Sequence, residues 1–140
     1  MDIRKDTEKA VNYRALAELR FELRKFLSFS EVAARKAGLE PQQHHLLLAI
    51  KGIAQGSQPT VGELAKRLHT RHHSVVELID RLEARQLVSR RKSVQDRRQV
   101  RIELTPEGEQ ILEALSVQHR AELETAGPEL LDALSALLGR

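Results

Sequence analysis

Two groups of polar side chains in the second half of the chain are of types that bind anions. Guanidinium and imidazole groups donate hydrogen bonds to phosphate oxygens and to base edges, and a serine hydroxyl does the same. The first group is Arg71, His72, His73 and Ser74, and the second is Arg90, Arg97 and Arg98, with Asp96 beside the last two. Because an arginine cannot lose its charge and suits a narrow groove of negative potential, Arg97 and Arg98 are typical of a basic loop at a DNA minor groove. The alternative is an ordinary solvated loop.

The same residue types give little support to catalysis. The chain has no histidine and carboxylate arrangement around a nucleophile, no glycine-rich phosphate loop and no HExxH-like spacing. His69 and His73 are four residues apart, but a turn is predicted between them, so we expect no shared metal. Asp80 and Glu83 fall on one side of a helix, and charge pairing with Arg81, Arg85 or a neighbouring helix explains them. We therefore predict a protein that is not an enzyme and needs no cofactor.

The charges are unevenly distributed along the chain. Eleven basic and five acidic residues lie between Glu63 and Arg101, whereas two basic and eight acidic residues follow from Ile102 to the end. A basic middle and an acidic tail indicate one surface that attracts phosphate and another that avoids it. Solvated helix faces are the plainer alternative for the charge pattern taken alone.

Composition narrows the class of protein further. A chain of 140 residues suffices for one modest core with an added association surface, and the scarcity of aromatic residues implies an aliphatic core. The chain has no cysteine, which excludes disulfides, thiol redox sensing and thiolate metal sites. Residues 1–8 contain no apolar run typical of a signal peptide, and no run is long enough for a membrane span. We expect a cytoplasmic protein that does not associate with membranes.

The elements that must position the basic groups are two short helices and a hairpin. Thr60 is a suitable N-cap for a helix to Leu68, and a second helix begins near His72 with Val75, Leu78, Ile79 and Leu82 as its buried stripe. Residues 99–104 alternate apolar and polar side chains as a half-buried strand does, and residues 87–91 are the expected partner strand. This arrangement leaves the first group of polar residues at the exposed first turn of the second helix, where the helix dipole favours phosphate.

Longer helices flank this region. We predict a helix over residues 6–37 that stops at Gly38, a central helix over 41–54, and a helix from Pro106 to about Ala126. Gly127-Pro128 is predicted to break the chain before a short leucine-rich helix at the end. The opening helix is too long to bury its apolar stripe within so small a domain, and the last helix is too short to be stable alone. The opening helix is therefore expected to pack against a partner chain, and the last helix is expected to dock on another part of the protein.

An ordered set of segments resembles the winged-helix core of the MarR family of transcriptional regulators. The segments are Glu63-Leu-Ala-Lys-Arg-Leu68, Ser74-Val75, Leu78-Ile-Asp-Arg-Leu-Glu83, Leu87-Val88, Arg90, Asp96-Arg-Arg98 and Leu104-Thr-Pro-Glu-Gly108. This resemblance covers about residues 60–108 and depends on the order of the segments, since none is specific alone. Gln86 departs from the family's usual glycine, and would be strained if its backbone is left-handed. His72 and His73 replace small residues or proline, which leaves the DNA sequence preference open.

The resemblance implies a mainly α fold with a small β-hairpin wing. Residues 39–105 would form the DNA-binding domain, and residues 1–38 with 106–140 would form a helical dimerisation region. It also implies a homodimer that binds double-stranded DNA at a pseudo-palindromic operator, acts as a repressor and is released by a small aromatic or anionic effector. Arg71, His72, His73 and Ser74 would serve the major groove, Arg97 and Arg98 the minor groove and backbone, Arg90 a phosphate, and Asp96 would orient an arginine.

Two expectations remain less defined. Tyr13, Arg20, Arg24 and His44 are candidate liners of an effector site where the dimer helices meet the winged domain, with no preference among them. The competing interpretation is a helical dimeric interaction module that has lost specific DNA binding. Salt-sensitive DNA association would distinguish the two, because neutralising phosphates releases counterions.

Overall fold

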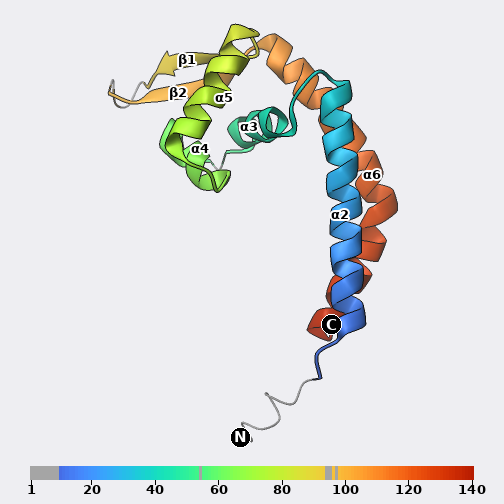
Figure 1. Ribbon diagram of the computed structural model, residues 1–140. Coiled ribbons are helices and arrows are strands. Elements are labelled where there is room, and N and C mark those ends of the chain that lie inside the picture. The colour runs from blue at the N-terminus through green and yellow to red at the C-terminus, as the bar shows by residue number, and fades with distance from the viewer. Residues whose placement is uncertain (1–9, 54, 94–95, 97) are drawn as a thin grey trace, which may run out of the picture. The chain divides into compact units, whose positions relative to one another are not determined.

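The computed structural model describes residues 10–53, 55–93, 96 and 98–140 of the chain. Within these residues it contains five helices and one two-stranded antiparallel sheet (Figure 1). The elements are α2 (Tyr13–Lys36), α3 (Pro41–Lys51), α4 (Val61–Arg67), α5 (His72–Ala84), β1 (Val88–Lys92), β2 (Val100–Leu104) and α6 (Pro106–Leu138). The predicted mainly α fold with a hairpin wing is confirmed.

Contacts divide the chain into two compact units. One consists of the described residues up to Phe29 together with His119–Arg140, and the other is Ser30–Gln118. These divisions fall inside α2 and α6, whereas the sequence suggested boundaries at the ends of those helices. The end of α2 and the first part of α6 thus belong, by their contacts, with the helix pair and the hairpin. We call Ser30–Gln118 the winged unit and the other the helical unit.

The core of the winged unit is aliphatic, as the composition predicts. Its fully or almost fully buried side chains include Leu46, Leu47, Leu64, Val75, Ile79, Leu82, Val88 and Ile102. They come from α3, α4, α5 and both strands, so each short element contributes one face to the same interior. Burial of such a side chain contributes about 1.5 to 3 kcal/mol, which orders helices too short to be stable alone.

Left-handed residues end α2, α4 and α5 and set the direction in which the chain leaves each helix. Gly38, His69 and Gln86 have φ values of 84°, 50° and 59°. In each case the amide two residues past the cap donates to a carbonyl in the last helical turn, for example Leu87 N to Leu82 O at 2.9 Å. This is the Schellman arrangement, which satisfies carbonyls that the helix end would leave unpaired. The predicted stop at Gly38 is confirmed, and the backbone of Gln86 is left-handed, which is the condition under which strain was expected there.

The hairpin is held in place by the segment that precedes α4. In the hairpin, Arg90 pairs with Ile102 and Lys92 with Val100. The Ile102 amide donates to the Pro59 carbonyl at 2.9 Å, and Thr60 forms an isolated antiparallel bridge with Arg101. A short third strand position therefore lies beside β2. Thr60 also caps α4, since its hydroxyl accepts the Glu63 amide at 3.3 Å.

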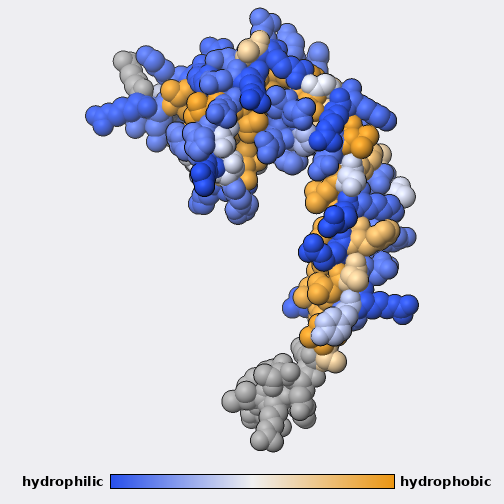
Figure 2. Space-filling model, in the orientation of Figure 1, coloured by the Kyte–Doolittle hydropathy of each residue, from blue (hydrophilic) through white to orange (hydrophobic). Residues whose placement is uncertain are grey.

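The helical unit pairs the start of α2 with the end of α6. His119 of α6 contacts the edges of Phe26 and Phe29 of α2, with ring centroids 5.8 and 5.4 Å apart. Several large apolar side chains of this unit remain exposed: Leu16, Phe21, Leu23, Leu27, Leu123, Leu131, Leu134 and Leu138. Figure 2 shows apolar surface along these two helices.

Three predicted helix boundaries were wrong. Helix α3 ends at Lys51 with Gly52 as its C-cap residue, whereas a helix over residues 41–54 was predicted. Helix α2 begins at Tyr13, after residues 10–12 that are not helical, because the Asn12 side chain accepts the Ala15 amide at 3.0 Å and caps the helix there. Residues 6–9 of the predicted helix lie outside the described residues. Helix α6 continues through Gly127-Pro128 to Leu138 instead of breaking. Gly127 has no Cβ to clash with the proline ring, and Ala126 and Ala133 are buried on either side, so packing outweighs the missing hydrogen bond.

Among the described residues, no helix has the length and apolar character of a membrane span.

Candidate nucleic-acid interface

The first turn of α5 exposes most of the first predicted basic group. Arg71 is the N-cap residue with extended backbone, and its side chain makes no capping hydrogen bond. His72 and His73 follow it and are exposed, whereas Ser74 is half-buried. An uncapped helix start presents amide donors and the positive end of the dipole on the surface that carries these side chains. Such a surface can hold a phosphate while the side chains contact base edges.

The turn between α4 and α5 fixes the direction of that surface. The amides of His69 and Thr70 donate to the carbonyls of Lys66 and Ala65, at 3.3 and 3.0 Å. The backbone of His69 is left-handed although the residue is not a glycine, and no neighbouring residue in the sequence indicates this conformation. The angle between the two helices is thus set by backbone hydrogen bonds as well as by the buried stripe.

Asp96 and Arg98 are the residues of the predicted wing tip that the structure describes. Arg98 is exposed, and its backbone amide donates to Asp96 Oδ1 at 3.0 Å. The Gln99 amide donates to the Asp96 carbonyl at 3.0 Å, so Asp96 holds the loop backbone next to Arg98. The prediction was that Asp96 orients an arginine, and these contacts act on the backbone of one. Arg97 lies outside the described residues.

Arg90 has a different environment from the other predicted wing residues. Its Nη2 lies 2.5 Å from Asp80 Oδ1 and its Nη1 lies 2.5 Å from Glu83 Oε1. Hydrogen bonding to Asp80 first, and then the charge of Glu83, raises the pKa of Arg90, although partial burial opposes this. The guanidinium that was predicted to contact a phosphate is therefore paired with two carboxylates of α5. We predicted that Asp80 and Glu83 pair with Arg81, Arg85 or a neighbouring helix. The ion-pair partner that the structure shows is Arg90 on β1.

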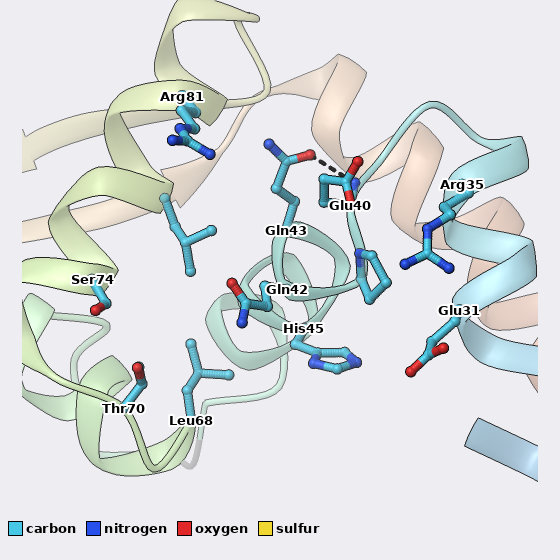
Figure 3. A pocket seen from close by; sticks show the side chains of 12 residues that line it. Glu31, Arg35, Glu40, Gln42, Gln43, His45, Leu68, Thr70, Ser74 and Arg81 are labelled. Carbon is cyan, nitrogen blue, oxygen red and sulfur yellow. Dashed lines mark hydrogen bonds between the residues drawn. The ribbon is translucent and has the colours of Figure 1, made fainter. Parts of the chain in front are cut away.

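A polar cavity of about 850 Å³ lies within the winged unit, between α2, α3 and the inner side of α5 (Figure 3). Its charged lining residues are Glu31, Arg35, Glu40, His45 and Arg81. Leu68, Ser74 and Leu78 also line it, which explains why these three are only half-buried. Tyr13, Arg20, Arg24 and His44, the candidate effector liners, are not among its lining residues.

Sequence reasoning missed the anchor at the base of the wing. Ser93 directly follows β1 and is 2% exposed, and its hydroxyl lies 3.0 Å from Gln58 Oε1. Its amide donates to the Gln99 carbonyl at 2.9 Å, which closes the loop. Nothing local in the sequence pairs these two residues, which are 35 positions apart.

The helix pair, its turn and the adjoining hairpin together define a winged helix-turn-helix. Residues 37–99 match the model of the MarR family. Two HTH-type transcriptional regulators of Bacillus subtilis, YsmB and YhbI, are 39% and 42% identical over 46% and 52% of this chain. The matches cover 44% and 47% of those proteins, so the chain spans about half the length of these relatives.

Several solved structures are similar in fold to most of this chain. A MarR family protein from Bacillus stearothermophilus is 28% identical, with a TM-score of 0.63 over 83% of this chain and 81% of that one. A mutant of S. aureus MepR bound to an oligodeoxyribonucleotide is 22% identical, with a TM-score of 0.66 over 93% of this chain and 95% of that one. The match to the MarR family over residues 37–99 includes most of the ordered motifs that indicated this family, and the solved structures share the fold over most of the chain.

Proposed function

We propose that this protein is a homodimeric, sequence-specific DNA-binding transcriptional regulator that acts in the cytoplasm, and that it represses genes through a pseudo-palindromic operator. The observation that carries the proposal is the exposed, uncapped first turn of α5 with Arg71, His72 and His73 beside a basic hairpin. A helix start fits the major groove, and a basic loop fits the backbone or the adjacent minor groove. The match of residues 37–99 to the MarR family and the likeness in fold to a MepR mutant bound to an oligodeoxyribonucleotide support the same conclusion.

The helical unit supports the dimer in this proposal. Its exposed leucines and Phe21 form an apolar surface that a monomer in water rarely maintains. Burying it against the same surface of a second copy would give a two-fold symmetric protein. Two copies of α5 would then lie about one DNA turn apart, roughly 34 Å, on half-sites related by the same symmetry.

Release by a small anionic or aromatic effector is the regulatory part of the proposal. The cavity beside α5 offers Arg35, Arg81 and His45 to an anion and the side chains of Leu68 and Leu78 to an apolar ring. Because the cavity is lined by α5 itself, a ligand there can favour one position of that helix. DNA is released only if the ligand binds the free arrangement more tightly than the DNA-bound one.

The experiment that tests the function is selection of bound fragments from a random DNA pool, at two salt concentrations. We expect an inverted repeat with half-sites about one helical turn apart, and affinity that falls steeply with salt. Arg97→Ala plus Arg98→Ala should weaken binding to all sequences while the dimer survives. The control is Arg120→Ala plus Arg140→Ala, which removes the same charge from the acidic end of the chain. Wild-type affinity in the wing variant would refute the role of the wing.

The second candidate function is a dimeric interaction module without specific DNA binding. The pairing of Arg90 with two acids favours it in one respect, since this pairing removes one positive charge from the wing surface. The same selection separates the two functions. An interaction module would enrich no sequence, and any association with DNA would show no symmetric half-sites.

A further inference from the structure

The Arg90 side chain connects the hairpin to α5. Arg90 is at the centre of β1, where its backbone pairs with Ile102, a fully buried residue of β2. Its guanidinium reaches the outward face of α5 and contacts Asp80 and Glu83 through different nitrogen atoms. One side chain therefore joins the middle of the hairpin to the helix that carries Arg71, His72 and His73.

The chemistry of this connection requires an arginine. Asp80 and Glu83 are three residues apart on α5, so their carboxylates lie on one side of the helix. A planar guanidinium donates along two directions at once and can bind both, whereas a lysine ammonium is a point charge on a flexible stem. One positive and two negative groups also leave a local excess of negative charge, which is unfavourable for a phosphate contact.

The opposite edge of the hairpin is fixed independently. Ile102 donates to the Pro59 carbonyl, and the Ser93 hydroxyl contacts Gln58, so the segment before α4 holds β2 and the base of the loop. Arg90 acts from the other side, toward α5. The two sets of contacts restrain the hairpin relative to both helices of the helix-turn-helix.

We infer that Arg90 is a positioning residue for DNA recognition, which sets the distance between the wing and the first turn of α5 through Asp80 and Glu83. The inference rests on the proposed function, because that distance matters when the helix and the wing must enter neighbouring grooves together. Specific binding requires both contacts in register, whereas non-specific attraction to phosphates tolerates a misplaced wing.

Neutral variants of the acids distinguish positioning from a phosphate contact by the sign of their effect. If Arg90 contacts phosphate, Asp80→Asn and Glu83→Gln remove negative charge, free the guanidinium and should tighten DNA binding. If Arg90 positions the wing, both changes should weaken binding to the selected operator by roughly tenfold, as for coupled residues in one network. Arg90→Lys should weaken it similarly although it keeps the charge.

Salt dependence provides a second readout. Loss of a phosphate contact reduces the slope of log affinity against log salt by about 0.9 on duplex DNA. We expect Arg90→Gln to leave that slope and the non-specific affinity close to wild type and to lower only the ratio of specific to non-specific affinity. Arg91→Gln is the matched control, because it removes the same charge from the neighbouring exposed residue, whose contact is to Glu103 on β2 at 3.4 Å.

Hydrogen exchange in the free protein tests the connection without DNA. Glu83→Gln, the mildest change, should speed exchange of the β1 and β2 amides while amides of α3 keep their protection. If wild-type protein selects no DNA sequence, the proposed function fails, and this measurement alone decides whether Arg90 restrains the hairpin. Unchanged exchange in Glu83→Gln and Arg90→Gln, tighter binding in Asp80→Asn, or a reduced salt slope in Arg90→Gln would each overturn the inference.

Discussion

Gly108 lies directly against the carbonyl oxygen of Leu87, which a Cβ at position 108 would approach to 2.1 Å. The same carbonyl accepts the Thr105 amide at 3.0 Å. Thr105 also donates its hydroxyl to the Gln86 carbonyl at 2.7 Å and accepts the Gly108 amide at 3.1 Å. The start of α6 is thus joined to the turn between α5 and β1 by close contacts that leave no room for a side chain at position 108.

We predict that Gly108→Ala destabilises the protein. Alanine favours a helix over glycine by about 1 kcal/mol, but the clash is with backbone that cannot rotate away, and overpacking costs about 1 to 3 kcal/mol. The clash should dominate, and denaturant unfolding at fixed protein concentration measures it. Gly62→Ala in α4 is the control, because its Cβ meets nothing within 4 Å and should be neutral or stabilising. Equal effects at the two positions would contradict the predicted contact.

Gln86→Gly should stabilise the protein by about 0.5 to 1 kcal/mol. A left-handed conformation costs an ordinary residue about 1 to 2 kcal/mol, and the larger freedom of glycine in the unfolded chain offsets part of the gain. Gln86→Ala keeps the left-handed strain while it removes the side chain, so it separates the two effects in thermal unfolding. A loss of stability in the glycine variant would mean that the Gln86 side chain contributes more than its backbone costs.

Pro128→Ala should also raise stability, by about 1 to 3 kcal/mol, because it restores the hydrogen bond that proline removes from the interior of α6. Pro106→Ala is the matched control, since proline at the first helical position lacks a donor that has no partner in any case. Chemical denaturation of both variants at one protein concentration provides the comparison. If Pro128→Ala is neutral, the helix is not continuous there in solution.

The association surface can be tested with one exposed leucine. Leu131 of α6 is 63% exposed, so Leu131→Glu should leave the chain folded and shift it from dimer to monomer by at least tenfold in dissociation constant. Leu48→Glu on α3, at a position that is 50% exposed, places the same charge in the winged unit and should leave association unchanged. Sedimentation equilibrium measures both. A monomeric wild type would refute the dimer directly.

Local signals made much of the fold predictable. Thr60, Gly38 and Pro106 mark helix ends through their own chemistry, and the alternation in residues 99–104 requires no distant partner to indicate a strand. For the same reason the exposure of Arg71, His72 and His73 could be predicted, since it follows from the stripe on one helix. The helix pair and hairpin are the part of the site that these patterns define.

Other features depend on residues that meet only in the folded chain. Asp80 and Glu83 have Arg81 and Arg85 nearby in sequence, and nothing local favours Arg90 over them. The left-handed turn at His69 has no glycine to indicate it. Gly127-Pro128 is typical of a helix break, but α6 continues through it because packing on both sides outweighs the hydrogen bond that proline removes. The cavity likewise combines side chains from separate helices, which periodicity does not identify.

The hydrogen bond between Ile102 and Pro59 has a consequence for the order of folding. It joins positions separated by the whole of α4, α5 and β1, and closing so long a loop costs entropy before any contact offsets it. Helices α4 and α5 should therefore form first, and β2 should join them late. During synthesis, a growing polypeptide could not complete this structure until the ribosome had released the chain beyond Leu104.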